Sequence, residues 1–267
     1  MYFKKNKLSV ACLGLSLAAA LSACSVTAPR SATADPQDPW EGMNRHTQAF
    51  NDNLDDYVMK PLAQGYNWIM PDFAHHAVTN FFSNLDDIGV TANDALQGKL
   101  DQSWQDGARL LVNTTAGLGG FIDWGSEMDL PKHNEDFDQT LGQWGVGTGP
   151  YLVLPLFGPS SARGFLGLLT DLALNPISYT GIYFGSNNYV SYAVSGGLGV
   201  LKAVDTRSNY LGLEKVASEA ALDRYDFFKN AYFERRNYLV NDGNVPEEDV
   251  LKFEEEKGQG MGPISPY

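Results

Sequence analysis

The spacing of apolar residues predicts helices over most of the chain. In three segments before residue 116, apolar side chains recur every three or four residues, which places them on one face of a helix. Pro61 is expected to end the first helix, because proline cannot continue the backbone hydrogen bonding. The apolar positions are Phe50, Leu54, Tyr57 and Val58, then Val78, Phe81, Phe82, Leu85, Ile88 and Ala92, then Trp104, Ala108, Leu111, Val112 and Thr115.

The middle of the chain has a different pattern. Residues 145–159 are apolar but interrupted by glycine and proline, so we expect a short β-hairpin near residues 144–157. Helical spacing resumes at residues 160–174 and 189–204, and a long charged helix is predicted from Leu213 to Val240. Its apolar face contains Ala221, Tyr225, Phe228, Tyr232 and Leu239. The predicted fold class is therefore mainly α, a single helical domain with a short Gly/Pro-rich hairpin.

The first 24 residues have the order of a bacterial lipoprotein signal. Three lysines precede a short apolar run that ends in Leu-Ser-Ala-Cys at Cys24, and this ending resembles a lipobox. The pattern predicts a signal peptide over residues 1–23 that is removed, after which the thiol of Cys24 carries the lipid. Cys12 lies within the removed segment, so no disulfide, thiolate metal site or cysteine nucleophile is expected in the mature chain.

The rest of the chain divides by composition. Residues 24–37 are rich in Ser, Thr, Ala, Pro and Asp and are expected to form a flexible tether. Residues 38–242 carry the helical pattern. Residues 243–267 are acidic and are predicted to be a mobile tail, which could steer a basic partner or have no role beyond solubility.

Charge and hydropathy exclude several classes of function. The formal net charge is -13, and no basic cluster is longer than the pair Arg235 and Arg236, so nucleic acid is not an expected partner. The mature chain has no run of about 18 apolar residues, the length that spans a bilayer. Any contact between the protein body and a membrane must therefore involve amphipathic helices that lie in the plane of the bilayer.

No motif nominates a catalytic, nucleotide or metal site. The glycines of residues 145–150 lack the dinucleotide-binding spacing, no Walker lysine follows them, and the lipase sequence Gly-x-Ser-x-Gly is missing. We therefore expect no enzyme, no cofactor and no metal. The remaining charged groups are interpreted as solvated surface, with contact to lipid phosphate as an alternative for the arginines. They are His133, Glu135, Asp136 and Asp138 at a turn, and Arg235 and Arg236 on a helix.

Two apolar segments allow two interpretations. Their side chains either fill the protein core or face acyl chains, as residues of a lipid path or of a membrane-facing surface. The candidates are Phe121, Ile122, Trp124, Tyr151, Leu152, Leu154, Leu156 and Phe157. Gly145, Gly147 and Gly149 come just before the second segment. Because glycine accepts large dihedral changes, these three are candidates for gating residues.

Many short motifs, in one order, resemble a single family. They are Asp-Pro-Trp-Glu-Gly-Met-Asn-Arg at 38–45, Phe-Asn-Asp-Asn-Leu-Asp at 50–55, Asn-Phe-Phe-Ser-Asn-Leu at 80–85, Arg109 with Asn-Thr-Thr-Ala-Gly-Leu-Gly-Gly-Phe-Ile-Asp at 113–123, Glu-Asp-Phe-Asp-Gln-Thr-Leu-Gly at 135–142, Trp-Gly-Val-Gly-Thr-Gly-Pro-Tyr at 144–151, Gly-Pro-Ser-Ser-Ala-Arg at 158–163 and Ala-Tyr-Phe-Glu-Arg-Arg-Asn-Tyr at 231–238. This pattern resembles the MlaA (VacJ) lipoprotein family. Asp138, where the family usually has glycine, is interpreted as local turn variation.

The resemblance implies a fold and a task. It implies a ring-like, mostly helical lipoprotein of the Gram-negative outer membrane that faces the periplasm and associates with trimeric porins. It also implies that a central amphipathic channel takes mislocalised phospholipid from the outer leaflet and passes it to the periplasmic carrier MlaC, which maintains lipid asymmetry. Ser25, rather than Asp, follows Cys24 and by the same resemblance favours the outer membrane.

Two other classes of function stay open at this stage. One is a structural, porin-associated lipoprotein without transport activity, and the other is a phospholipid-processing enzyme.

The signal sequence generates the first prediction. Cys24→Ala should leave an unprocessed or mislocalised precursor, because the thiol that accepts the lipid is lost. Metabolic labelling with palmitate and membrane fractionation would measure this. Normal acylation and outer-membrane recovery of the variant would contradict it.

Overall fold

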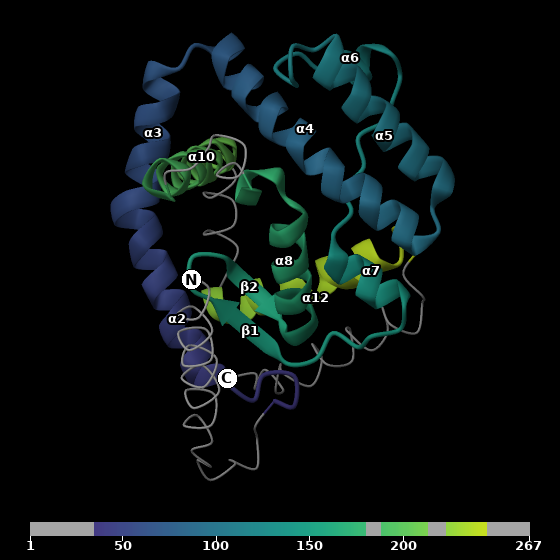
Figure 1. Ribbon diagram of the computed structural model, residues 1–267. Helices are drawn as coiled ribbons and strands as arrows, with labels where there is room; N and C mark the ends of the chain where they lie inside the picture. The colour runs from purple at the N-terminus through teal and green to yellow at the C-terminus, as the bar shows by residue number, and fades with distance from the viewer. Residues whose placement is uncertain (1–34, 180–187, 213–222, 245–267) are drawn as a thin grey trace, which may run out of the picture. The chain divides into compact units, whose positions relative to one another are not determined.

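The computed structural model describes residues 35–179, 188–212 and 223–244, and it is mainly helical, as predicted (Figure 1). The chain divides into two units between Pro39 and Trp40, and the helices and strands named below all lie in the second unit. The signal peptide with Cys24, most of the tether and the tail beyond Asn244 lie outside the described residues.

The first helices form one continuous rod. Helix α2 (Glu41–Leu54) passes through a π-helical segment (Asp55–Met59) into α3 (Lys60–Ile69). The prediction that Pro61 ends the helix is therefore wrong. The wider π turn, in which the Lys60 N–H bonds to the Asp55 carbonyl, precedes Pro61, so the proline stands in the first turn of α3, where its missing N–H is tolerated.

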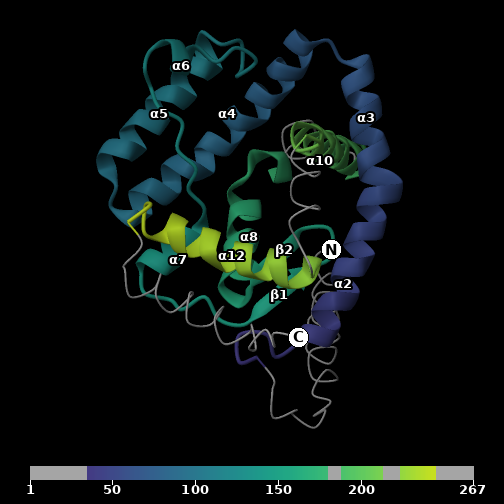
Figure 2. The same ribbon diagram turned by 180° about the vertical axis from the view of Figure 1, so that it is seen from behind.

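The longest helix, α4 (Asp72–Gln97), packs against α5 (Leu100–Thr115) (Figures 1 and 2). Gly98 ends α4 with a φ of 79°, a left-handed conformation that suits glycine. The short helix α6 (Trp124–Glu127) follows α5, and the carboxylate of Asp123 caps it by accepting a hydrogen bond from the Ser126 N–H.

A hairpin follows α7 (Phe137–Gln143), and its bounds differ from those predicted. Strand β1 (Tyr151–Leu154) pairs antiparallel with β2 (Gly158–Ser161), and α8 (Ala162–Leu174) follows directly. The prediction of a hairpin is confirmed, but its second strand lies beyond residue 157. The polar sequence of β2, Gly-Pro-Ser-Ser, has no apolar alternation that would mark a strand.

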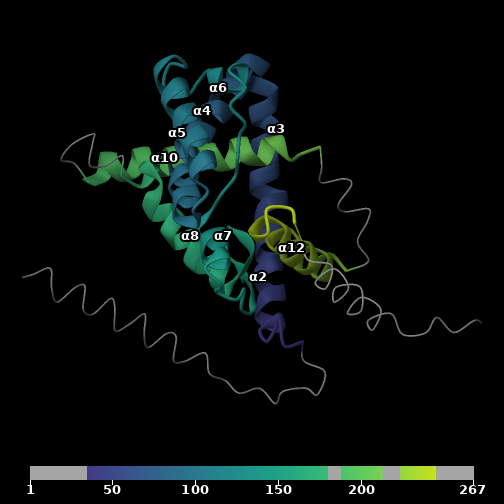
Figure 3. The same cartoon turned by 90° about the vertical axis from the view of Figure 1, so that its right-hand side faces the viewer.

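The last two helices have other bounds than predicted: the helix expected over residues 189–204 is longer, and the one expected from Leu213 to Val240 is shorter. After a 3-10 turn (Pro176–Tyr179), α10 (Asn188–Asn209) crosses α3 and α4, as Figure 3 shows. Helix α12 (Arg224–Val240) begins at its N-cap Asp223, whose backbone is extended. A single helix from Leu213 is therefore wrong, because the Asp223 carboxylate bonds the Tyr225 and Asp226 N–H groups and starts a new helix.

Packing between elements closes a circuit within the second unit. Helix α2 contacts β1, β2 contacts α12, α12 contacts α7, α7 contacts α4, and α10 contacts both α4 and α3. Because α3 continues α2, the circuit returns to its start (Figure 2). The hairpin therefore lies between α2 and α12, and contacts between residues far apart in the sequence hold it there.

Two asparagines hold α2 against the hairpin. The side chain of Asn44, which is fully buried, donates to the Tyr151 carbonyl at 3.0 Å and accepts from the Val153 N–H at 2.9 Å. Two helical turns later, Asn51 donates to the Leu154 carbonyl and accepts from the Leu156 N–H, both at 2.9 Å. The two amides thus satisfy backbone groups of β1 and of the turn that follows it, which have no partner in a third strand.

The interior of the second unit is unusually polar. Among the described residues, buried polar and charged side chains outnumber buried apolar ones, and the apolar core around Tyr151, Val153 and Tyr225 is small. Many large apolar side chains are exposed instead, among them Trp68, Phe73, Trp104, Leu111 and Leu156. Yet none of the described helices is both long and apolar enough to cross a membrane.

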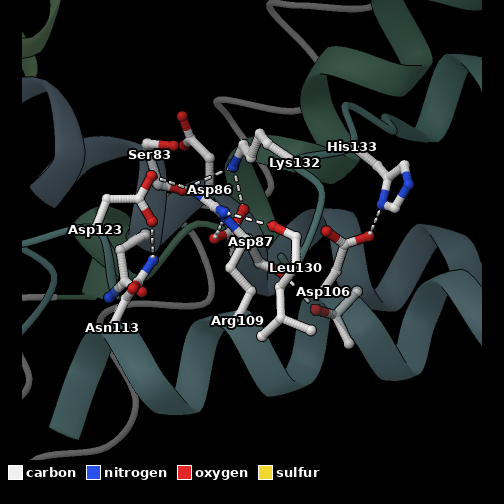
Figure 4. Close-up of polar contacts among 12 residues, drawn as sticks. Ser83, Asp86, Asp87, Asp106, Arg109, Asn113, Asp123, Leu130, Lys132 and His133 are labelled. Atoms are coloured by element: carbon white, nitrogen blue, oxygen red, sulfur yellow. Dashed lines mark hydrogen bonds and ion pairs between the residues drawn. The ribbon is translucent and has the colours of Figure 1, made fainter. Parts of the chain in front are cut away.

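Figure 4 shows a cluster of polar contacts between α4, α5 and the segment after α5. The guanidinium of Arg109 donates to Asp123 at 2.5 Å and to the Leu130 carbonyl at 2.9 Å, while Lys132 pairs with the buried Asp87. Burial alone would raise the pKa of Asp123, but hydrogen bonds from Ser126, Arg109 and Asn113 hold it below the usual value. These contacts fasten the segment after α5 onto both helices.

A second buried group consists of two carboxyls that face each other from α4 and α5. Asp94 and Asp106 are fully buried and lie within hydrogen-bonding reach, and Asp106 also contacts Nδ1 of His133 at 2.9 Å. Burial, and next the hydrogen bond and charge of Asp106, raise the pKa of Asp94 to about 8. One carboxyl of the pair therefore keeps its proton at neutral pH.

The asparagine contacts predict a specific loss of stability. Asn44→Ala should lower the free energy of unfolding by about 2–3 kcal/mol, because it leaves two buried backbone groups of β1 without partners. Asn53→Ala is the matched control, since Asn53 is exposed on the same helix and bonds only the Ala49 carbonyl. Chemical denaturation of the detergent-solubilised proteins measures the difference, and equal stabilities of the two variants would contradict it.

The carboxyl pair predicts a dependence of stability on pH. Because the folded state raises the pKa of Asp94, its stabilisation is complete below about pH 4 and is lost as the pH rises through about 8. Asp94→Asn removes this loss. The free energy of unfolding of the variant, minus that of the native protein, should therefore increase between pH 6 and pH 9. The expected increase is on the order of 2–3 kcal/mol.

Thermal unfolding across that pH range tests the prediction. Asp101→Asn, at an exposed carboxylate on α5, serves as the control and should follow the native pH profile. Parallel profiles for Asp94→Asn and the native protein would mean that the pair does not share a proton.

Candidate functional site

The structure separates the two apolar candidate segments. Phe121, Ile122 and Trp124 follow α5 and are each 45% exposed, while the other candidates lie in the hairpin, elsewhere in the second unit (Figures 1 and 2). Phe121 stacks on Phe81 of α4, with ring centroids 5.1 Å apart. The two segments therefore present two distinct apolar surfaces rather than one.

The hairpin candidates have different environments. Tyr151 is fully buried against Tyr225, Tyr232 and Phe233, so it is a core residue. It is therefore no longer a candidate for a lipid path or a membrane-facing surface. Leu152 and Leu154 are half-buried. Leu156 and Phe157 form the exposed turn between the strands, and Phe157 also lines two cavities that are open to the surface.

The three candidate glycines are not equivalent. Gly145 and Gly149 have positive φ angles of 85° and 72°, a conformation that other residues adopt only with strain. Gly147 has no such requirement, and a Cβ atom built there would meet nothing within 4 Å. Gly147 therefore tests the gating prediction without a direct penalty to the fold.

Three cavities follow one another alongside α12. The first, of about 260 Å³, lies between α2, the π segment, the hairpin turn and the start of α12. The second, of about 210 Å³, shares Phe157 and Pro159 with the first. The third, of about 320 Å³, shares Asp136, Asp171 and Arg236 with the second and reaches α4. We call this succession the cavity row.

Helix α12 supplies one wall along the entire row. Arg224 and Phe228 line the first cavity, Tyr232 the second, and Arg236 the second and third. These residues are four apart, so they form one stripe of the helix. The two ends of the stripe are charged and its middle is aromatic. The apolar face predicted for this helix included Phe228 and Tyr232 but missed the two arginines that continue the stripe.

Apolar and charged groups share the walls of the second cavity. Leu154, Phe157 and Leu168 form its apolar side, and Asp136, Asp138 and Arg236 are among its charged groups. Such a wall can contact apolar and charged groups of a ligand at the same time. The cavity row is therefore amphipathic.

A network of ion pairs fixes the charged side. Asp138, 2% exposed, accepts from Arg163 at 2.6 Å and lies 3.3 Å from Nε of Arg236, which also pairs with Asp136 at 2.5 Å. The expectation of a solvated turn at Asp136 and Asp138, and of a solvated helix face at Arg236, is therefore wrong. Burial would lower the pKa of Arg236, but the charges of Asp136 and Asp138 raise it, so the guanidinium stays charged.

The other residues of that turn also have partners. His133 contacts the buried Asp106, and Glu135 pairs with Lys99 at 2.9 Å. The variation at Asp138 is therefore more than a local turn feature, because the carboxylate joins α7 to Arg163 of α8 and Arg236 of α12. In residues 35–179, 188–212 and 223–244, no group of three or more His, Cys, Asp or Glu is placed to hold a metal ion.

Asp171 stands at the junction of the second and third cavities. Its carboxylate accepts from the Phe137 N–H at 3.1 and 3.2 Å and from the Asn93 amide at 3.3 Å. Burial raises its pKa to about 6, opposed by the Phe137 hydrogen bond, so the group is largely ionised above pH 7. No sequence pattern selects Asp171, since it lies within an apolar helix and in none of the recognised motifs.

Comparisons with known proteins agree with this architecture. Residues 36–239 match the MlaA lipoprotein family. The chain is 34% identical over 218 residues to the protein named intermembrane phospholipid transport system lipoprotein MlaA of Shigella flexneri. This match covers 79% of this chain and 82% of the relative. The chain is 41% identical over 143 residues to an uncharacterized protein of Rickettsia felis, and this match spans 53% of the chain and 57% of the relative's length.

A solved structure has a similar fold. It is described as "Structural basis for maintenance of bacterial outer membrane lipid asymmetry", and the likeness has a TM-score of 0.65 at 30% sequence identity. The likeness covers 76% of this chain and 99% of that one. Family match, relatives and fold therefore agree over the same region, and the chain belongs to the MlaA lipoprotein family.

Proposed function

We propose that this protein is an outer-membrane lipoprotein that takes mislocalised phospholipid from the outer leaflet and passes it to a periplasmic carrier. The single observation that carries the proposal is the distribution of polarity. Charged side chains are buried around an amphipathic cavity row, while large aromatic and aliphatic side chains cover the exterior. This is the distribution expected of a body that is surrounded by lipid and contains a polar path.

The names of the relatives support the same task. The Shigella relative is named as a lipoprotein of an intermembrane phospholipid transport system, and the similar structure is described in terms of outer-membrane lipid asymmetry. The lipobox at Cys24 agrees with attachment to a membrane of the cell envelope. Porins that hold the body in the membrane and the carrier MlaC are the partners that we propose from the family.

The physical need for such a path is large. A diacyl phospholipid has about 30 methylene groups, and each costs about 0.8 kcal/mol when it is exposed to water. A lipid therefore does not cross an aqueous gap unaided. The path must shelter acyl chains beside residues such as Phe157 and Leu168 while the headgroup passes the charged side of the same cavities. The proposed transfer is passive, and its direction comes from the partners.

The exposed helices suggest how the body sits in the bilayer. Trp68 and Phe73 lie at the two sides of the α3–α4 connection, and Trp104 and Leu111 lie on α5, all of them exposed. We propose that these helices lie in the plane of the bilayer rather than across it. Aromatic side chains suit that position, because one end of the ring system can stay near the headgroups.

The function is tested by comparing cells that lack the protein with cells in which it is restored. We expect surface phosphatidylethanolamine, labelled with an amine-reactive reagent that does not cross the membrane, to rise on loss and return on restoration. Porin levels are matched by immunoblotting. Unchanged labelling at equal porin levels would favour a purely structural lipoprotein. Release of lysophospholipid from vesicles by the purified protein would favour an enzyme.

The glycine segment provides a mutational test of the path. Gly147→Val should alter surface phospholipid at unchanged protein abundance, because position 147 has space for a side chain and no positive φ. Gly149→Val is the comparison variant, since its φ is 72° and a Cβ atom there would lie 3.0 Å from Ala162. It should lose abundance and function together. A parallel loss of abundance in Gly147→Val would instead assign that glycine a structural role.

A further inference from the structure

The carboxylate of Asp171 differs from the other acidic groups of the third cavity. Asp86 pairs with Lys202 at 2.5 Å, Glu135 with Lys99 and Asp136 with Arg236. In the part of the chain that the structure describes, no lysine or arginine lies within ion-pair distance of Asp171. Arg236, which is itself held by Asp136 and Asp138, acts on Asp171 only from a longer distance, so this carboxylate has no direct cationic partner at the wall of a cavity of about 320 Å³.

The hydrogen bonds to Asp171 leave room for another donor. Oδ1 accepts from the Phe137 N–H and the Asn93 amide, while Oδ2 accepts only from the Phe137 N–H. Both donors are neutral. A carboxylate oxygen accepts two or more hydrogen bonds, so Oδ2 retains capacity for a donor that enters from the cavity. A cationic donor would be favoured, because charge-assisted hydrogen bonds are the stronger kind.

The wall of the same cavity also carries a cationic side chain. Arg235 lines the third cavity from α12, is exposed, and makes no ion pair within the described residues. The neighbouring Arg236, by contrast, is held by Asp136 and Asp138. One cavity thus offers one carboxylate without a direct cationic partner and one guanidinium that is available to an anion.

We propose that this cavity selects phospholipids with a phosphate and a primary ammonium in the headgroup, as in phosphatidylethanolamine, over anionic phospholipids. Asp171 receives the ammonium and Arg235 the phosphate. This inference rests on the proposed function, because it names the class of lipid that the path prefers. An anionic headgroup with a neutral polyol end would place no cation beside Asp171 and would leave the carboxylate without a direct cationic partner.

The experiment reads which lipid occupies the cavity. A photo-crosslinking residue replaces Leu239, on the wall of the third cavity, and in a second protein it replaces Leu111, which is exposed on α5 and lines none of the three cavities (Leu239→p-benzoylphenylalanine and Leu111→p-benzoylphenylalanine). The full-length lipoprotein is reconstituted in vesicles with equal amounts of phosphatidylethanolamine and phosphatidylglycerol of identical acyl chains. Crosslinked lipids are then identified by mass spectrometry at pH 7.5.

The expected result is a preference at position 239 alone. After normalisation to position 111, phosphatidylethanolamine should exceed phosphatidylglycerol by about fivefold, the ratio for roughly 1 kcal/mol from one partly buried ion pair. Asp171→Asn should bring the ratio close to one, while Asp101→Asn, at an exposed carboxylate outside the cavities, should leave it unchanged. Arg235→Gln should lower the yield with both lipids, since both carry a phosphate.

Three results would overturn the inference. The first is a ratio near one in the native protein, which rejects headgroup selection but leaves lipid occupancy and the proposed function standing. The second is an unchanged ratio in Asp171→Asn whose circular dichroism and melting match the native protein. The third is the lack of any lipid crosslink at position 239 when position 111 is labelled, which rejects the lipid path itself.

Discussion

The pairing of a helix with a strand edge is the contact on which the second unit depends. Asn44 and Asn51 lie two turns apart on α2, so their amides point to the same side and match successive backbone groups of β1. A two-stranded hairpin alone is marginal in water. Here one edge of the hairpin is covered by side-chain amides, and its far strand contacts α12. The hairpin is thereby fixed between the two helices that border the first cavity.

This arrangement explains how a small apolar core suffices. The Tyr151 carbonyl accepts a hydrogen bond from Asn44 of α2, while the Tyr151 ring packs against three aromatic rings of α12. Elsewhere the contacts between elements are ion pairs and amide hydrogen bonds, such as Asp138 with Arg163 and Asp123 with Arg109. Buried charges of this kind cost free energy when one partner is lost, so they specify geometry more than they add stability. A conduit for a charged headgroup requires such fixed polar walls.

The sequence predicted the elements better than their partners. Helical spacing found the regions of α4, α5, α8 and α10, because one face of each is apolar. It missed the continuation through Pro61, since a π turn depends on hydrogen bonding that no spacing rule records. It missed β2, whose residues are polar. It assigned Asp138 and Arg236 to solvent, because a charged residue carries no local signal of a partner 25 or 100 positions away in the chain. Tyr151 could not be told from the apolar residues beside it in the sequence, but it is a core residue.

The π segment between α2 and α3 also changes the direction in which the side chains of α3 point relative to those of α2. A π turn accommodates one extra residue, which rotates everything after it by about 100° relative to a regular helix. Within one uninterrupted rod, α2 contacts the hairpin and α3 contacts α10. The ion pair between Asp55 and Arg207 of α10, at 2.6 Å, fixes the rod at the point of rotation. Loss of a single residue between 55 and 59 would therefore keep the helix intact but turn its second half away from α10. No substitution in the same segment would have this effect, because a substitution leaves the number of residues unchanged.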